Sequence, residues 1–120
     1  MRVDGCAWCG ERRDETAFGT RVWSGRVSDA YFARRGRVMV VWRGRHVVEP
    51  VDLSPVESDL YHREVLTVAR AIRDCFRPDR LNFLTVADEE PHLHTLIETR
   101  YPGGVGDPRV DAAALHASLM

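Results

Sequence analysis

Residues 91–98 read Pro-His-Leu-His-Thr-Leu-Ile-Glu and carry the strongest structural signal in this chain. The run has the pattern of a β-strand, in which successive side chains point to opposite faces of a sheet. One face would carry the alternate residues His92, His94, Leu96 and Glu98. We therefore expect two neighbouring imidazoles on one face of a sheet.

A second signal lies near the start of the chain, where residues 6–9 read Cys-Ala-Trp-Cys. Two cysteines at this spacing supply half of a four-ligand zinc site, which needs two more nitrogen or sulfur donors. The histidines of residues 91–98 are candidates to supply one of them. The same cysteine pair could instead be a redox pair, and the residues alone leave both interpretations open.

Length and composition limit the class of protein. A chain of 120 residues with 44% hydrophobic content predicts one globular domain with a modest core. We expect a cytoplasmic protein, because no apolar run is long enough for a transmembrane helix or a signal peptide. A net charge of -1 argues against nucleic acid or a membrane surface as partner, since both favour a basic excess.

The rest of the chain predicts a small antiparallel sheet. Short strands are expected at residues 20–23 and 27–33, on either side of a Ser-Gly turn. Residues 37–42 are rich in β-branched and large apolar side chains and predict a core strand. A further strand is expected at residues 81–86. With residues 91–98, the sheet would have about five strands.

One main helix is predicted between the third and fourth of these strands. Ser54 is a good N-cap, Pro55 suits the first helical position, and Glu57 completes a capping box. Apolar residues then follow in steps of three and four as far as Phe76. Pro78 ends the helix, because the residue before a proline avoids helical geometry.

The C-terminal residues are expected to form a tail on this domain. We predict a domain over residues 1–104 and a tail over residues 105–120, with a short helix from Asp111 to Leu119. A sheet with one main helix and a short second one belongs to the α+β class.

In these features the chain resembles the histidine triad (HIT) superfamily of nucleotide hydrolases and transferases. The matching features, in the family's order, are Cys6-x-x-Cys9, the strand from Gly36 leading to Arg45-His46-Val47, the helix opening Asp52-Leu53-Ser54-Pro55, Asn82, and Pro91-His92-Leu93-His94 followed by Arg100-Tyr101-Pro102-Gly103-Gly104. No single feature is specific, but the ordered set covers most of the chain. The resemblance implies a HIT-like fold and, because relatives commonly pair, a homodimer.

The resemblance also implies a metal site. In the zinc-bearing branch, which includes galactose-1-phosphate uridylyltransferase, the matching ligands would be Cys6, Cys9, His46 and His92. Two thiolates and two imidazoles form a closed tetrahedral site of the structural type. Such a zinc ion would hold the N-terminal segment against the sheet and couple metal binding to folding.

The resemblance gives His94 the role of nucleophile. Its imidazole would attack the α-phosphorus of a nucleotide derivative and form a covalent nucleotidyl-histidine, which water or another acceptor then resolves. Asn82 would help to position the phosphate or ribose, or it could make an ordinary hydrogen bond at a strand edge.

Three departures from the family's pattern matter for this chemistry. The third histidine, which contacts the leaving group's oxygens in active relatives, is Leu96 here, and leucine cannot donate a hydrogen bond. A histidine expected after Gly36 is Arg37, which could clamp a phosphate or remain solvated. Residues 87–90, Ala-Asp-Glu-Glu, bring three carboxylates close to the expected phosphate site.

Three functions therefore stay open from the sequence. The chain could be a nucleotidyl hydrolase or transferase that uses His94, with Arg37 or Arg100 assisting the phosphate of a nucleotide-like ligand. It could be a relative turned to non-nucleotide chemistry, with an apolar pocket at Leu96. It could also be a catalytically silent binding module stabilised by zinc.

Overall fold

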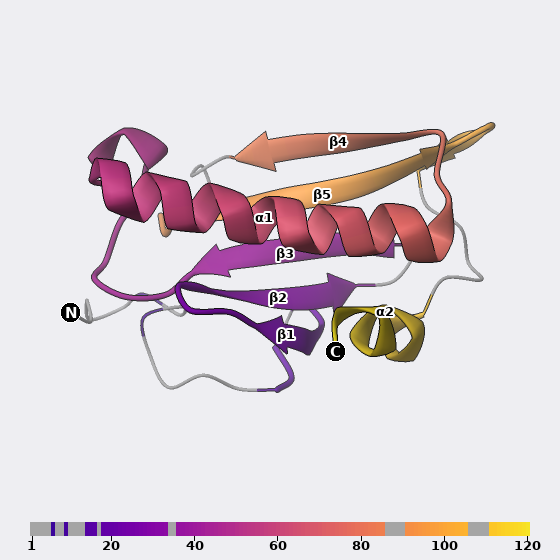
Figure 1. Ribbon diagram of the computed structural model, residues 1–120, viewed down its shortest axis with the longest axis horizontal. Coiled ribbons are helices and arrows are strands. Elements are labelled where there is room, and N and C mark those ends of the chain that lie inside the picture. Colours follow the sequence, from indigo (N-terminus) through magenta and orange to yellow (C-terminus); the bar gives the residue numbers. More distant parts are fainter. Residues whose placement is uncertain are drawn as a thin grey trace.

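The computed structural model describes residues 6, 9, 14–16, 18–33, 36–85, 91–105 and 111–120. It is an antiparallel sheet with a long helix across one face and a short helix at one edge (Figure 1). The elements are β1 (Thr20–Ser24), β2 (Ser28–Ala33), β3 (Arg37–Trp42), η2 (Pro50–Asp52), α1 (Pro55–Phe76), β4 (Arg80–Thr85), β5 (His94–Tyr101), β6 (Gly104–Val105) and α2 (Ala112–Leu119). The predicted α+β class, with an antiparallel sheet, one main helix and a short C-terminal helix, is confirmed.

The strand order is β1-β2-β3-β5-β4, and the two-residue β6 pairs with β5. Every neighbouring pair is antiparallel. Strand β5, which carries His94, therefore lies between β3 and β4, while β4 forms an edge of the sheet. The order places residues of β3 and β4 on the two sides of the strand that carries the histidine.

Helix α1 begins and ends as its sequence predicts. The Ser54 hydroxyl accepts from the Glu57 amide at 3.2 Å, and the Glu57 carboxylate accepts from the Ser54 amide at 2.8 Å. At the other end, Arg77 adopts the left-handed conformation with φ of 50°, and its amide donates to the Arg73 carbonyl. The helix therefore ends at this cap, and the chain turns and enters β4 three residues later.

The core lies between α1 and one face of the sheet. Val68 and Ile72 of α1 are fully buried, as are Val38, Val40 and Ile97 of the strands that they cover. The Tyr61 hydroxyl contacts the Thr95 hydroxyl at 2.8 Å, and burial raises the pKa of this phenol. Because the odd-numbered residues of β5 face α1, the even-numbered residues, including His94, face away from it.

Helix α2 lies at the β1 edge of the sheet, which is the edge opposite to β4 (Figure 1). The short helix predicted from Asp111 to Leu119 is confirmed, and Asp111 caps it, accepting from the Ala114 amide at 2.8 Å. Leu115 is fully buried, and His116 donates from Nδ1 to the Val22 carbonyl at 2.7 Å. The short C-terminal helix is thus packed against the sheet. No helix in the described ranges is both long and apolar enough to cross a membrane.

The strand predicted at residues 91–98 is displaced in the structure, where β5 covers His94–Tyr101. His92 lies before the first residue of β5. Its neighbour Leu93 makes backbone hydrogen bonds outside the strand pairing of β5, because its amide donates to the Val47 carbonyl and its carbonyl accepts from the Trp42 amide. The predicted strand at 81–86 is β4, at 80–85. The acidic segment 87–90, with its predicted effect on phosphate binding, lies outside the described residues.

Candidate functional site

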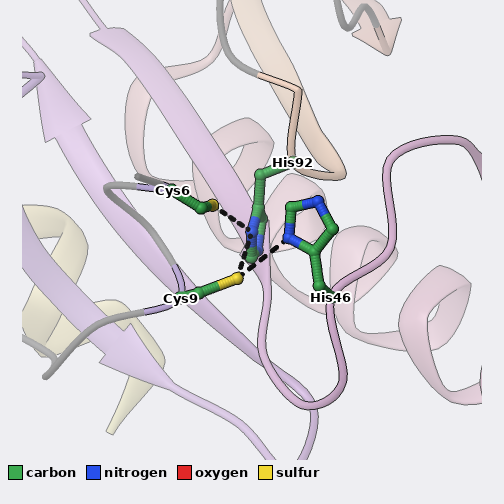
Figure 2. A group of neighbouring side chains, drawn as sticks. All are labelled: Cys6, Cys9, His46 and His92. Atoms are coloured by element: carbon green, nitrogen blue, oxygen red, sulfur yellow. Dashed lines mark hydrogen bonds between the residues drawn. The ribbon is translucent and has the colours of Figure 1, made fainter. Parts of the chain in front are cut away.

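Four side chains that are far apart in the sequence meet beyond the end of β3. The ligand atoms of Cys6, Cys9, His46 and His92 all lie within 4.8 Å of one another (Figure 2). The Cys6 sulfur is 3.2 Å from Nδ1 of His92, and the Cys9 sulfur is 3.0 Å from Nδ1 of His46 and 3.4 Å from Nδ1 of His92. The cysteines and His46 are half-buried, and His92 is buried.

This donor set fits zinc in chemistry and in size. Around a tetrahedral zinc ion, sulfur and nitrogen ligands lie about 3.3 to 3.8 Å from one another, given the usual metal–ligand bond lengths. The distances between the thiols and imidazoles are close to that range. Two thiolates would also balance the charge of a divalent ion. The four residues that the resemblance implies as ligands thus form one candidate metal centre.

The hydrogen bond on the far side of the His92 ring orients it for metal binding. Its Nε2 is 2.7 Å from the Trp42 carbonyl. A carbonyl oxygen only accepts, so in the neutral ring Nε2 carries the proton and Nδ1 presents its lone pair to the cysteines. Metal-binding histidines are usually fixed in this way by a second partner. The buried ring is therefore held in the tautomer that a metal requires.

The loop that carries His46 is fastened to the start of α1. Arg45 donates to Glu57 through both Nε, at 3.0 Å, and Nη2, at 2.7 Å. The hydrogen bond from Arg45 is the largest of the causes that lower the pKa of Glu57 to about 2, and hydrogen bonds at the Ser54 cap add to it. Trp42 also donates from its indole to the Arg45 carbonyl at 2.8 Å. Residue 46 thus follows a residue anchored at both its side chain and its backbone.

His94 lies beside this centre but does not belong to it. Its Nδ1 is 2.7 Å from the His92 carbonyl, and only 6% of the residue is exposed. Because the carbonyl must accept, Nδ1 of neutral His94 carries the proton and Nε2 keeps a free lone pair. This is the form in which an imidazole can act as a nucleophile. The sequence could not identify this partner.

The side chains beside His94 on its face of the sheet are apolar. Val41 pairs with His94, and Leu96 lies between Met39 of β3 and Leu84 of β4. Cross-strand partners share a face, so Met39, Leu84 and Leu96 form a row across three strands, which we call the apolar row. The row lies about 7 Å along β5 from His94. Leu96 is thus beside the candidate nucleophile, as the resemblance implies.

The polar candidates for substrate binding lie farther from His94. Arg37 forms an ion pair with Glu98 at 3.2 Å, and Asn82 pairs with Glu98 on the opposite side. Glu98 is about 13 Å along the strand from His94, and Arg100 is about 20 Å away. The backbones of Arg37, Asn82 and Arg100 thus lie about 13 Å or more along the sheet from that of His94, and their roles toward a substrate stay predictions.

Two parts of this arrangement, the apolar row and the Trp42 carbonyl, were not predicted from the sequence. The apolar row depends on the register of β3 and β4 against β5, which alternation along one strand does not fix. The alternation along each strand indicates that Met39 and Leu84 point away from the core. Nothing in the sequence, however, indicates that they lie beside Leu96. The Trp42 carbonyl is a backbone group and has no sequence signal.

The structure also has a cavity of about 350 Å³ on the opposite face of the sheet from His94. It lies between α1 and β4, where Tyr61, Val65, Leu66, Phe83 and Thr95 are among its lining residues. Thr95 points into it, so its neighbour His94 points away. The cavity is therefore separate from the candidate catalytic histidine.

Comparison with solved structures finds neighbours that are described as histidine triad proteins. A histidine triad protein from Bradyrhizobium japonicum superposes with a TM-score of 0.74 at 20% identity, covering 86% of this chain and 92% of its own. A member of the HIT family from Bacillus subtilis has a TM-score of 0.71 at 25% identity, covering 90% of this chain and 82% of its own.

A third neighbour is a zinc-bound histidine triad family protein from Mycobacterium smegmatis. Its TM-score is 0.66 at 20% identity, and the alignment covers 82% of each chain. No protein-family model and no curated protein matches the sequence.

Proposed function

We propose that this chain, which has the histidine triad fold, is a nucleotidyl hydrolase or transferase that forms a covalent nucleotidyl-His94 intermediate. The observation that carries the proposal is the 2.7 Å contact between Nδ1 of His94 and the His92 carbonyl. It leaves Nε2 of a nearly buried imidazole as the free nitrogen. A similar structure from Sulfolobus tokodaii, described as a hypothetical histidine triad nucleotide-binding protein, supports a nucleotide as ligand.

The proposed mechanism uses both nitrogens of His94. Nε2 attacks the α-phosphorus, a nitrogen–phosphorus bond forms, and the bond from phosphorus to the leaving group breaks. The ring gains positive charge in this step, and the His92 carbonyl stabilises it through the Nδ1 proton. Water or another acceptor then attacks the phosphorus and releases the imidazole.

In this proposal Cys6, Cys9, His46 and His92 hold a structural zinc ion. With four protein ligands, zinc has no open position for substrate, so its contribution is to fix the N-terminal segment against the sheet. His92 would join this centre to the catalytic residue, because its side chain faces the cysteines and its carbonyl accepts from His94.

The test is to trap the intermediate. The protein is mixed with a panel of nucleoside phosphoramidates, dinucleoside polyphosphates and aryl nucleotide esters, quenched in base, and examined by intact mass and phosphorus NMR. We expect a mass increase of one nucleotidyl group in the parent and in His116→Ala, a control histidine on α2 at the opposite edge of the sheet. His94→Ala should gain no mass. An adduct in His94→Ala, or none in the parent with any substrate, would contradict the proposal.

We also propose that the protein is a homodimer in which a second copy covers the β4 edge. Among the described strands, β4 pairs only with β5, and it exposes 48% of Phe83. Phe83 lies on the rim of the α1/β4 cavity beside Val65 and Leu66. An edge that no second described strand covers, next to an apolar hollow, suits pairing with an identical edge.

A further inference from the structure

We propose that the apolar row makes this protein selective for nucleotide esters or anhydrides whose leaving group is apolar and departs as a stable anion, namely a phenolate or a carboxylate. The inference rests on the proposed function and specifies its substrate class. It follows from three side chains, Met39, Leu84 and Leu96, that lie together next to His94.

The first step concerns position. Leu96 follows His94 by two residues on β5, and both face away from α1. A group attached to a phosphorus in front of Nε2 of His94 can reach the row, because two residues of a strand span about 7 Å. Strands lie about 4.8 Å apart, so the row from Met39 through Leu96 to Leu84 is about 10 Å wide. This width matches an aromatic ring or a short aliphatic chain.

The second step concerns protons. None of the three side chains can donate a hydrogen bond or supply a proton. An amine or alkoxide departs poorly without a proton donor, whereas a phenolate or carboxylate is stable as the anion. A site with leucine at residue 96 would therefore disfavour phosphoramidates and favour esters of acidic alcohols and mixed anhydrides.

The third step concerns affinity. Arg37 is paired with Glu98 and lies one row farther away, so it is not free to hold a second phosphate beside His94. Apolar contact instead favours a hydrocarbon group, by about fourfold in binding for each methylene that is buried. Leu96 and Met39 are half-buried and Leu84 is 40% exposed, so the row is open to a ligand.

The reaction balances without a proton donor on the leaving group. The Nε2–phosphorus bond forms while the phosphorus–oxygen bond breaks, and that oxygen keeps the electron pair. Water then forms a new phosphorus–oxygen bond, the electron pair of the broken nitrogen–phosphorus bond returns to Nε2, and the protons of water pass to solvent. The products are a nucleoside monophosphate and the anion of an apolar acid.

The test compares 4-nitrophenyl, phenyl and naphthyl esters of adenosine and uridine monophosphates with the corresponding phosphoramidates. In the parent, kcat/KM should fall at least about tenfold from the acidic nitrophenol to phenol, and the phosphoramidate should be the poorest substrate. Leu96→His restores a proton donor and should raise phosphoramidate turnover about a hundredfold while reducing the difference between the two phenols. Leu60→His, at a half-buried leucine of α1, is the matched control and should behave as the parent.

A second variant tests the apolar contact and does not depend on the folding of Leu96→His. Leu84→Ser changes an exposed side chain on the edge strand and should raise KM for the naphthyl ester about tenfold, with little effect on the nitrophenyl ester. Equal parent rates for all leaving groups, together with no change of preference in either variant, would overturn the inference. If no substrate gives a His94 adduct in the parent, the proposed function fails instead.

Discussion

At the scale of single residues, His92 makes contacts through both ring nitrogens and through its backbone carbonyl. Its Nδ1 faces two sulfurs, its Nε2 donates to the Trp42 carbonyl, and its own carbonyl accepts from His94. The resemblance implied only the first of these. The backbone carbonyls could not be predicted, because any residue type supplies one and only the fold determines where it points.

We predict that Cys9→Ser weakens zinc binding at least about a hundredfold, because a hydroxyl is a much poorer zinc ligand than a thiolate. The unfolding temperature should fall toward that of the chelator-treated parent, since binding of a structural metal is coupled to folding. Competition with a chromophoric chelator measures the affinity, and thermal unfolding measures the stability.

Cys75→Ser is the matched control for this experiment. Cys75 is also a free, half-buried cysteine, but it lies on α1, outside the four-residue cluster. It should bind zinc as the parent does. Unchanged zinc affinity in Cys9→Ser would show that the cluster does not hold the metal.

At the scale of elements, the sequence predicted the bounds of the helices more accurately than those of the strands. Ser54, Pro55 and Glu57 predicted the start of α1 to the residue, because capping depends on contacts within one turn. The start of β5 was misplaced by three residues, since a strand ends where its partners end. The two-residue β6 had no periodic signal at all.

The junction between α1 and the His46 loop predicts a pH dependence. The pKa of Glu57 is lowered from an ordinary 4.5 to about 2, mainly by the hydrogen bond from Arg45. A lowered folded-state pKa stabilises the fold above the unfolded value, and this contribution is lost as the pH falls from about 4.5 to about 2. We predict that Glu57→Gln lowers stability at pH 6, and that its difference from the parent disappears near pH 2.

Urea unfolding followed by circular dichroism at each pH measures this difference. Asp59→Asn removes an exposed carboxylate from the same helix and should change stability little across the range. A difference between Glu57→Gln and the parent that stays constant from pH 6 to pH 2 would show that the Arg45 contact is not responsible.

At the scale of the whole molecule, the β4 edge, where the described part of the chain adds no further strand, predicts assembly. Phe83→Glu should convert the proposed dimer into a monomer, because two carboxylates would be brought into an apolar contact across a two-fold axis. Sedimentation velocity at micromolar concentration measures the mass. Met120→Glu changes a residue that is 90% exposed at the end of α2, at the other edge of the sheet, and should leave the mass unchanged. A monomeric parent would contradict the prediction.

The several contacts of His92 limit the substitutions that this scaffold can accept during evolution. In the proposed function, a replacement at residue 96 changes one surface that contacts the substrate, so new specificities would arise there by single substitutions. A replacement at residue 92 would remove a proposed metal ligand and leave the oxygen of residue 42 without its imidazole donor. Variation that retains the fold should therefore accumulate around the reacting group, while the support behind it stays fixed.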